Sequence, residues 1–169
     1  MRPVSVRHAI GRGIRSPVLA AALIVVFAGT VLATASSNFG PPVTLSRGTL
    51  SDSVHYNAGA VKFQTKGSVD FVMQSITIGT PGSSGWHGHT GVVLVNVVSG
   101  TVTRYDADCV ATVNEAGSAF VESGENVPAL VRNESATTPV VLNANWIVPA
   151  GTPATSLRID LPNPGCPQN

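Results

Sequence analysis

The sequence predicts an all-β fold, either a double-sheet sandwich or a barrel, on the strength of three observations. Beyond residue 36 no stretch shows the apolar periodicity of a helix. Short runs rich in Val, Thr and Ile recur along the chain, and Gly and Pro separate them at close intervals. The length of 169 residues leaves room for one domain with a sizeable core. Many short strands within one domain are typical of sandwiches and barrels.

Each expected strand is an apolar or alternating run that ends at a turn signal. The strands are expected at residues 69–78, 91–98, 101–106, 118–122, 139–148 and 156–160. Ser99-Gly100 lies between two of them and predicts a tight hairpin, because glycine takes positive φ without strain. Residues 36–60 are polar and weakly patterned, so we expect them to add an edge strand or to wrap the barrel.

Four segments follow from this pattern. We expect a signal segment at 1–35, an N-terminal extension with edge strands at 36–65 and the main domain at 66–162. The tail at 163–169 has no pattern of its own, so it should depend on Cys166 to hold it down.

The N-terminus has the three parts of a secretory signal peptide. Four arginines precede residue 16, an uncharged apolar run extends from Val18 to Ala33, and Ala33-Thr34-Ala35 forms a small-residue cleavage site. We therefore expect a hydrophobic signal helix, cleavage before Ser36, and a mature protein that is secreted, extracellular or held in the cell envelope. The apolar run is shorter than the ~20 residues that cross a bilayer comfortably. An uncleaved membrane anchor is therefore the alternative.

Removal of the signal segment makes the protein acidic. Four of the ten basic residues belong to that segment and all nine acidic residues lie beyond residue 51, which leaves a formal charge of −3 with His neutral. The remaining basic residues form no stripe or cluster, so the surface is a poor match for a polyanion. The sequence therefore indicates a small-molecule or metal ligand and no nucleic-acid partner. A homodimer is an assembly that it allows.

The two cysteines, Cys109 and Cys166, lie far apart in the sequence. An even count in an exported chain is typical of a disulfide, and this separation matches no zinc or redox motif. We expect a disulfide that closes a loop of more than fifty residues. In the chain-entropy model, such a loop stabilises the fold by about 4 kcal/mol.

The motif with the clearest chemistry is His87-Gly88-His89, at the start of an apolar run. Alternate residues of a strand share a face, so both imidazoles should point the same way. Val93, Val95 and Val97 continue that face and make it the inner one. Imidazole suits zinc, copper, iron or nickel, but a metal site needs three or four ligands. The rest of the ligand set must come from elsewhere in the chain.

These residues resemble the first motif of the cupin superfamily, in which a glycine precedes His-x-His, a glutamate and a second glycine. Gly82 or Gly85 opens the motif loosely, His87-Gly88-His89 fits it, and Gly100 closes it at the expected distance. The glutamate position of the motif falls on Val93, so the resemblance finds no carboxylate there.

The stretch Gly117–Asn133 resembles the second cupin motif, with one residue more than the usual pattern. The proline of that motif falls on Ser123 and its histidine falls on Ala129. Sixteen residues, 101–116, separate the two motifs, as in compact single-domain cupins. The resemblance covers residues 69–149 and is greatest to small exported cupins with a Gly-Trp-His opening and a Cys-anchored tail.

The resemblance implies a cupin jelly roll, a double-sheet β-barrel whose mouth holds a metal or a small ligand. Cupins typically hold manganese, iron, zinc, nickel or copper with three histidines and one glutamate. The fold serves oxygenases, isomerases, lectin-like binders and storage proteins. Because Val93 and Ala129 occupy two of the four ligand positions, we expect a degenerate metal site with an apolar wall beside the imidazoles.

Several other side chains are candidates for the site. His55 lies outside both motifs and is the candidate third metal ligand. Glu122 and Glu125 flank the loop of the second motif, where the family has no ligand, and Trp146 is expected to pack in the barrel or at its rim. The expected small-molecule ligands of the barrel are His87, His89, Gln74, Trp86 and Asn145.

The leading interpretation is an exported cupin that binds a small molecule or one divalent transition metal (Zn, Cu, Mn, Fe or Ni) without strong catalytic activity. The alternative is a metal-dependent enzyme of the oxygenase or isomerase type with a non-standard ligand set. A structural envelope protein is a third interpretation. The third ligand distinguishes them, because His55 or a carboxylate beside the two histidines would favour the enzyme.

Overall fold

A computed structural model describes residues 32–168, so the expected signal helix lies outside the described residues. Within them almost all of the regular secondary structure is β-strand, and no helix is long and apolar enough to cross a bilayer. The elements are β1 (Ser37–Phe39), β2 (Val43–Leu50), β3 (His55–Ala58), β4 (Val61–Gln64), β5 (Val69–Ser83), β6 (His87–Ser99), β7 (Thr101–Tyr105), β8 (Ala111–Glu115), β9 (Ala119–Asn133), β10 (Val140–Pro149), the 3₁₀ turn η1 (Ala154–Ser156) and β11 (Arg158–Asp160).

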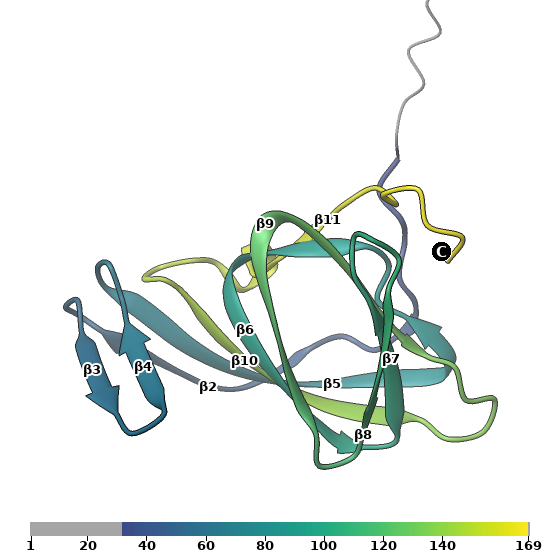
Figure 1. The fold of residues 1–169 in the computed structure, drawn as a ribbon, viewed down its shortest axis with the longest axis horizontal. Coiled ribbons are helices and arrows are strands. Elements are labelled where there is room, and N and C mark those ends of the chain that lie inside the picture. Colours follow the sequence, from purple (N-terminus) through teal and green to yellow (C-terminus); the bar gives the residue numbers. More distant parts are fainter. Residues whose placement is uncertain (1–31, 169) are drawn as a thin grey trace, which may run out of the picture. The chain divides into compact units, whose positions relative to one another are not determined.

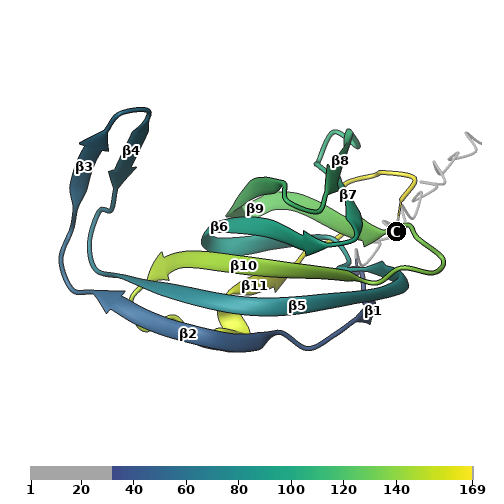
Figure 2. The same ribbon diagram turned by 90° about the horizontal axis from the view of Figure 1, so that it is seen from below.

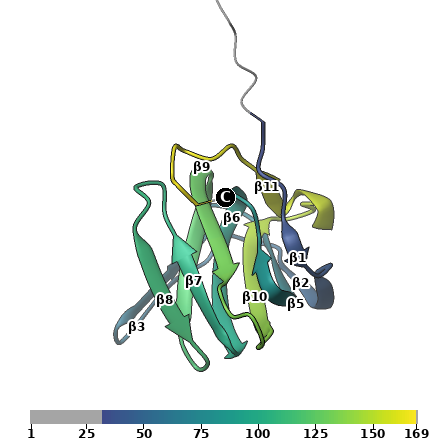
Figure 3. The ribbon, with the colours of Figure 1, turned by 90° about the vertical axis from the view of Figure 1, so that its right-hand side faces the viewer.

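Nine strands form one curled sheet with the order β1-β5-β10-β6-β9-β7-β8, in which β2 also pairs with β5 and β11 with β6. The ends of β5 and β9 pair at Gly82 and Asn133, which brings the two sides of the curl together. Figure 1 shows the curled sheet, and Figure 3 shows β7, β8 and β9 on one side with β10, β5 and β1 on the other. The predicted all-β, jelly-roll-like architecture is confirmed.

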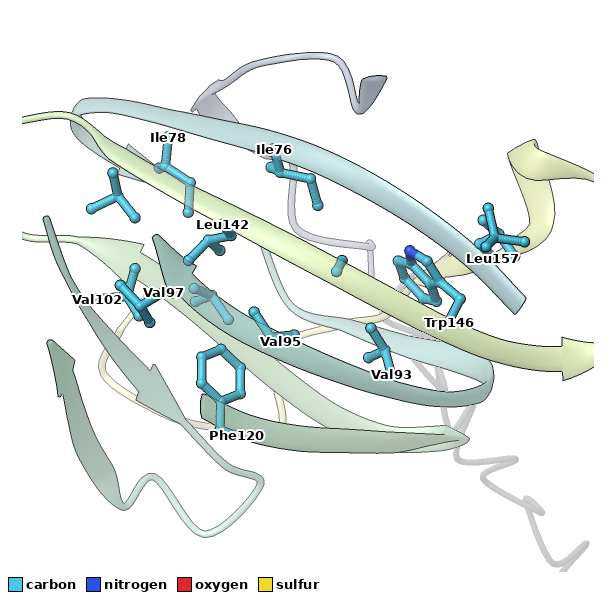
Figure 4. Packing of buried hydrophobic residues seen from close by; sticks show 14 of the residues in the cluster. Ile76, Ile78, Val93, Val95, Val97, Val102, Phe120, Leu142, Trp146 and Leu157 are labelled. Atoms are coloured by element: carbon cyan, nitrogen blue, oxygen red, sulfur yellow. The ribbon is translucent and has the colours of Figure 1, made fainter. Parts of the chain in front are cut away.

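The core lies inside the curl, where alternate residues of each strand meet. On β10, Leu142, Ala144, Trp146 and Val148 are buried, whereas the residues between them are half-exposed. Figure 4 shows Leu142 and Trp146 on β10 facing the interior of the curl, where Val95 and Phe120 also lie. The valines 93, 95 and 97 are buried in the same core, as the period-two pattern predicts.

The six expected strands are present, and three of them are longer than the sequence suggests. β5 continues to Ser83, β6 begins at His87, and β9 passes Gly124 and Pro128 to reach Asn133. Register shifts where β9 pairs with β6 show that β9 is irregular, which is how it accommodates residues that usually end a strand. β8 was not expected, because four of its five residues are exposed and it lacks apolar alternation.

The N-terminal extension contributes edge strands and a separate hairpin. β1 and β2 both pair with β5. β3 and β4 pair only with each other, and we call this hairpin, His55–Gln64, the arm. Figures 1 and 2 show the arm projecting from the body of the sheet at the end of β2 and β5.

The expected disulfide is present. Cys109 and Cys166 are joined with their Cα atoms 5.4 Å apart. Around them, Trp86 and Leu130 form a second apolar cluster that is separate from the main core. The bond therefore ties the C-terminal tail over Trp86, which is completely buried.

The expected cleavage site lies partly within the described fold. Ala33 forms a β-bridge with Pro162, and the Thr34 hydroxyl accepts a hydrogen bond of 2.6 Å from the Trp86 N–H. Gly85 has a φ of +68°, and a Cβ there would lie 2.4 Å from the Thr34 carbonyl oxygen. No other residue could pass so close, so residues 33–35 pack directly against the strand that carries the histidines.

Candidate metal centre

Three buried side chains converge at one end of the barrel interior. The Nε2 atom of His89 lies 3.1 Å from Oε2 of Glu122, and Nε2 of His87 lies 3.8 Å from the same oxygen. One potential ligand atom from each residue lies within 4.8 Å of the other two. Among the described residues this is the one group of three or more such side chains close enough to share a metal ion.

The strand geometry explains this convergence. His87 and His89 are alternate residues of β6, so both rings point into the barrel, and their centroids lie 4.8 Å apart. β9 runs antiparallel beside β6 and brings Glu122 to the same face. Gly88 permits this close approach, because a Cβ there would lie 2.5 Å from the Glu125 carbonyl oxygen.

A hydrogen bond fixes the orientation of His87. Its Nδ1 lies 2.9 Å from the carbonyl oxygen of Gly85, and a carbonyl can only accept, so Nδ1 carries the proton. The lone pair is then on Nε2, which faces Glu122. This is the arrangement that usually fixes the tautomer of a metal-ligating histidine.

Burial and mutual interactions set the ionisation of the cluster. Burial, the largest influence, lowers the pKa of His87 to about 4, so that its imidazole is neutral at pH 7. Burial alone would raise the pKa of Glu122, but the hydrogen bond with His89 and the proximity of His87 outweigh it and lower that pKa. A neutral imidazole and an ionised carboxylate are the forms that bind metal ions.

The three side chains face a small cavity of about 80 Å³ with mostly apolar walls. Its walls include Phe39, Ile76, Phe120, Leu142 and Trp146. The Trp146 ring packs against the His89 ring, with their centroids 5.1 Å apart. A molecule in this cavity would meet hydrocarbon on most sides and the His–Glu group at one end.

Comparison with known proteins gives likenesses of fold at low identity. No protein-family model matches the sequence, and no curated protein matches it. An uncharacterised Klebsiella pneumoniae protein with a double-stranded β-helix domain matches with a TM-score of 0.47 and 12% identity, over 72% of this chain and 86% of that one. A cupin domain of an XRE-family transcriptional regulator from Enterobacter cloacae matches with a TM-score of 0.38 and 23% identity. The match covers 46% of this chain and 80% of that one. Cupins are thus among its structural neighbours.

An enzyme is among the matches as well. A variant of salicylate 1,2-dioxygenase from Pseudoaminobacter salicylatoxidans matches with a TM-score of 0.40 and 16% identity, over 44% of this chain. This chain covers 19% of that dioxygenase chain, so about four-fifths of the dioxygenase has no counterpart in the match. The chemistry of the present site must therefore be argued from its own side chains.

Two of the residues expected at a cupin-type site do not line the cavity. Asn145 lies on the outward face of β10, where its amide donates to the Leu94 carbonyl, because alternate residues of a strand face opposite sides. Its neighbour Trp146 lines the cavity instead. Trp86 is buried in the second apolar cluster and donates from Nε1 to the Gln168 carbonyl.

Gln74 does line the cavity, as expected, with its amide donating to the Thr44 hydroxyl at 3.2 Å. His55 does not take part in the group. It lies exposed on the arm, in a two-stranded sheet of its own, where its nearest polar partner is Asn57 at 3.4 Å. The structure therefore places Glu122, rather than His55, beside the two histidines.

Glu122 was one of several candidate side chains, and the cupin motifs did not single it out as a ligand. Val93, where the cupin motif has its glutamate, is the direct cross-strand partner of Glu122. Position 122 supplies from β9 the carboxylate that position 93 lacks on β6. Strand alternation could have found it, because Phe120 and Glu122 share a face of β9 and the phenylalanine is buried.

The donor set fits a divalent transition metal. Oε1 of the buried Glu122 carboxylate has no hydrogen-bond partner among the described residues, and the same holds for Nδ1 of His89. A buried carboxylate is costly unless a cation balances it. Two imidazole nitrogens and one carboxylate oxygen beside it are ligands that iron, zinc, copper and nickel accept. His87, His89 and Glu122 are the residues that would hold the ion.

Proposed function

We propose that this protein is a metal-dependent enzyme of the cupin type, with His87, His89 and Glu122 as its metal ligands. The observation that carries the proposal is the convergence of two imidazole nitrogens and one carboxylate oxygen in a buried cluster. A pair of histidines alone favours a weak or relic site. A third ligand that is ionised and buried favours a working one.

Two histidines and one carboxylate form the ligand set of non-haem iron oxygenases, in which open coordination positions remain for substrate and oxygen. A bound divalent ion would supply Lewis-acid or oxygen-activating chemistry there. Neutral imidazoles and one carboxylate leave one positive charge uncompensated, which favours an anionic oxygen on the ligand. The oxygenase type therefore stands ahead of the isomerase type and of a binder without catalytic activity.

The cavity supports a small substrate with an apolar body. Its walls include Ile76, Leu142 and Trp146, and its volume is about 80 Å³. Gln74 supplies an amide on the wall, through which a polar group of the substrate can be oriented. The role of the protein would be to place an oxygen of the substrate at the His–Glu end and to keep bulk water away.

Export remains part of the proposal. The disulfide between Cys109 and Cys166 supports an oxidising compartment, since such bonds are rare in the cytosol. We therefore infer that the enzyme works outside the cytoplasm, in the cell envelope or beyond it.

Metal titration tests the ligand assignment. We expect the metal-free protein to bind one equivalent of Fe²⁺, Zn²⁺ or Co²⁺. Glu122→Ala should weaken that binding by about 100-fold or more, because it removes the anionic ligand. Glu125→Ala is the matched control, since this exposed carboxylate lies three residues further along β9, and its affinity should be unchanged.

Oxygen uptake separates the enzyme from a passive binder. The Fe²⁺-loaded protein should consume oxygen when a small carboxylic or phenolic compound of matching size is present, and the Glu122→Ala protein should not. Tight, stoichiometric metal binding without turnover on any compound in such a panel would favour the binder. Failure to bind metal at all would overturn the proposal.

A further inference from the structure

The curled sheet has an outer face that differs from the exposed face of an ordinary antiparallel sheet. Cross-strand pairs align side chains in rows that run from β5 across β10 and β6 to β9. One row consists of Met73, Asn145, Leu94 and Val121, each the direct partner of the next. Met73, Leu94 and Val121 are 39%, 40% and 55% exposed, so this row presents three large apolar side chains to solvent.

The adjacent row has the same character. It consists of Phe71, Ile147, Val92 and Ser123, again joined partner to partner. Phe71 and Val92 are exposed to nearly the same extent as their neighbours in the first row. Together the two rows form a contiguous apolar surface on four strands, which we call the outer face.

The outer face also lacks charge. The next row along the strands consists of Ser75, Asn143 and Asn96, and β2 adds Ser46 and Gly48 beside Met73 and Phe71. Among these described residues of the three rows there is no Asp, Glu, Lys or Arg. An antiparallel sheet that faces water on one side normally alternates apolar with polar or charged residues.

The arm has one apolar side and one polar side. Its cross-strand pairs place Tyr56 with Phe63 and Ala58 with Val61 on one side, whereas the alternate pairs, His55 with Gln64 and Asn57 with Lys62, lie on the other. Tyr56 and Val61 are 66% and 63% exposed. An isolated two-stranded hairpin is marginally stable in water unless its apolar side packs against something.

The apolar side of the arm is continuous with the outer face. The rings of Phe63 on the arm and Phe71 on β5 lie 6.0 Å apart, centroid to centroid. One uncharged surface therefore extends from the sheet onto the arm.

We propose that the outer face and the apolar side of the arm form the interface of a symmetric homodimer, with a second copy of this chain as the partner. A two-fold interface brings the same surface of both subunits together, so each charge on it would lie near a charge of the same sign close to the axis. A surface free of charge avoids this repulsion. Recognition of a different protein usually relies on complementary charges, and the outer face offers none.

The area of the apolar surface is consistent with a dimer interface. With strands ~4.8 Å apart and alternate residues ~6.7 Å apart, the two rows on the four strands β5, β10, β6 and β9 cover roughly 260 Å² in projection. The apolar side of the arm extends this patch, and apolar patches of several hundred Å² usually mark interaction sites. A stable interface buries about 800 Å² of accessible surface per partner, and the arm supplies a second apolar surface toward that total.

The test is the molar mass of the protein, purified as the producing cells process it, by light scattering and sedimentation velocity at micromolar concentration. We expect twice the chain mass for the unchanged protein. Leu94→Lys places a charge in the middle of the outer face and should halve the mass. Val113→Lys is the matched control, because Val113 is equally apolar and 63% exposed but lies on β8, and this variant should remain dimeric.

Two outcomes would overturn the proposal. One is that the unchanged protein is a monomer, whether it stays free in solution or sediments with phospholipid vesicles. The other is a dimer that persists in Leu94→Lys. If circular dichroism shows that Leu94→Lys does not fold, Val61→Lys decides, because Val61 on the arm lies outside both core clusters. A dimer that survives Val61→Lys would then contradict the interface.

Discussion

Glu122 reaches the two imidazoles from β9, whereas the cupin motif carries its glutamate on the histidine strand. Because Val93 and Glu122 are direct partners in the β6–β9 ladder, their side chains leave neighbouring points of the same inner face. A carboxylate at either position can occupy the same space beside His89. The aliphatic residue at position 93 is therefore balanced by an acidic one at position 122.

Ala129 occupies the position at which the second cupin motif has its histidine, and it leads to a prediction at the residue scale. Ala129 is the cross-strand partner of His87 and is buried. Ala129→His should add a third imidazole to the existing set and raise metal affinity by about tenfold or more. Isothermal titration with Zn²⁺ checks this, with the exposed Ala119→His on the same strand as the control. No gain in affinity would mean that the backbone of β9 at position 129 does not direct a side chain toward the ion.

A second residue-scale prediction concerns Asp70, which lies in the β2–β5 pair opposite Thr49. Hydrogen bonds from the Thr49 hydroxyl, the Gly151 N–H and Arg47 lower the pKa of Asp70 from 3.8 to about 2. Because the unfolded chain takes up the proton first as pH falls, this contribution to stability is complete above the unfolded pKa. It is lost as pH falls from 3.8 to about 2.

Asp70→Asn provides the comparison. We expect this variant to be less stable than the unchanged protein at pH 7, with the difference between the two narrowing below pH ~4. Urea unfolding at a series of pH values measures it. A difference that stays constant down to pH ~2.5 would show that the carboxylate of Asp70 does not carry the effect.

At the scale of elements, the first residues of β6 are held by segments distant in sequence. β11 pairs with His87–His89, and the Leu161 N–H donates to the Trp86 carbonyl. The Thr34 hydroxyl, in the N-terminal segment, accepts a hydrogen bond from the backbone N–H of Trp86. The strand that carries both histidines thus depends on the N-terminal and C-terminal segments together.

This dependence predicts the effect of Thr34→Val. The substitution leaves the backbone N–H of the buried Trp86 without its acceptor, so it should lower the free energy of unfolding by about 1 to 3 kcal/mol. The measurement is made on protein whose intact mass shows that residue 34 is present. Thr101→Val, on an exposed position of β7, is the control and should have little effect. Equal stability of Thr34→Val and the unchanged protein would contradict the contact.

The sequence was informative about elements to different degrees. The period-two pattern of the valines after His89 identified β6 and its inner face correctly, because apolar alternation is a local property. On β10 the expectation for Asn145 was wrong, because alternate residues of a strand face opposite sides and Trp146 lines the cavity instead. β9 was expected to end at Glu122, because a strand that is held only by its partner strand carries no local signal beyond Gly124.

At the scale of the whole molecule, the site depends on long-range pairing that a single sequence does not display. His89 and Glu122 meet because β6 and β9 are neighbours in the sheet, and strand order is a property of the complete fold. For the same reason the sequence left His55 as a candidate ligand, since nothing local shows that its hairpin stands apart from the sheet. The resemblance to cupins was enough to predict the two histidines of the site and the barrel around them. Identifying the carboxylate ligand requires the register between β6 and β9.

X-ray absorption spectroscopy of the zinc-loaded protein tests the central claim most directly, because it counts the imidazoles bound to the ion. The account predicts two imidazole nitrogens at about 2.0–2.1 Å and at least one carboxylate oxygen at about 2.0–2.2 Å. In the Glu122→Ala protein the carboxylate contribution should disappear. Three imidazoles around the ion, which would require a histidine other than His87 and His89, would contradict the assignment of the metal centre. A spectrum that Glu122→Ala leaves unchanged would contradict it as well.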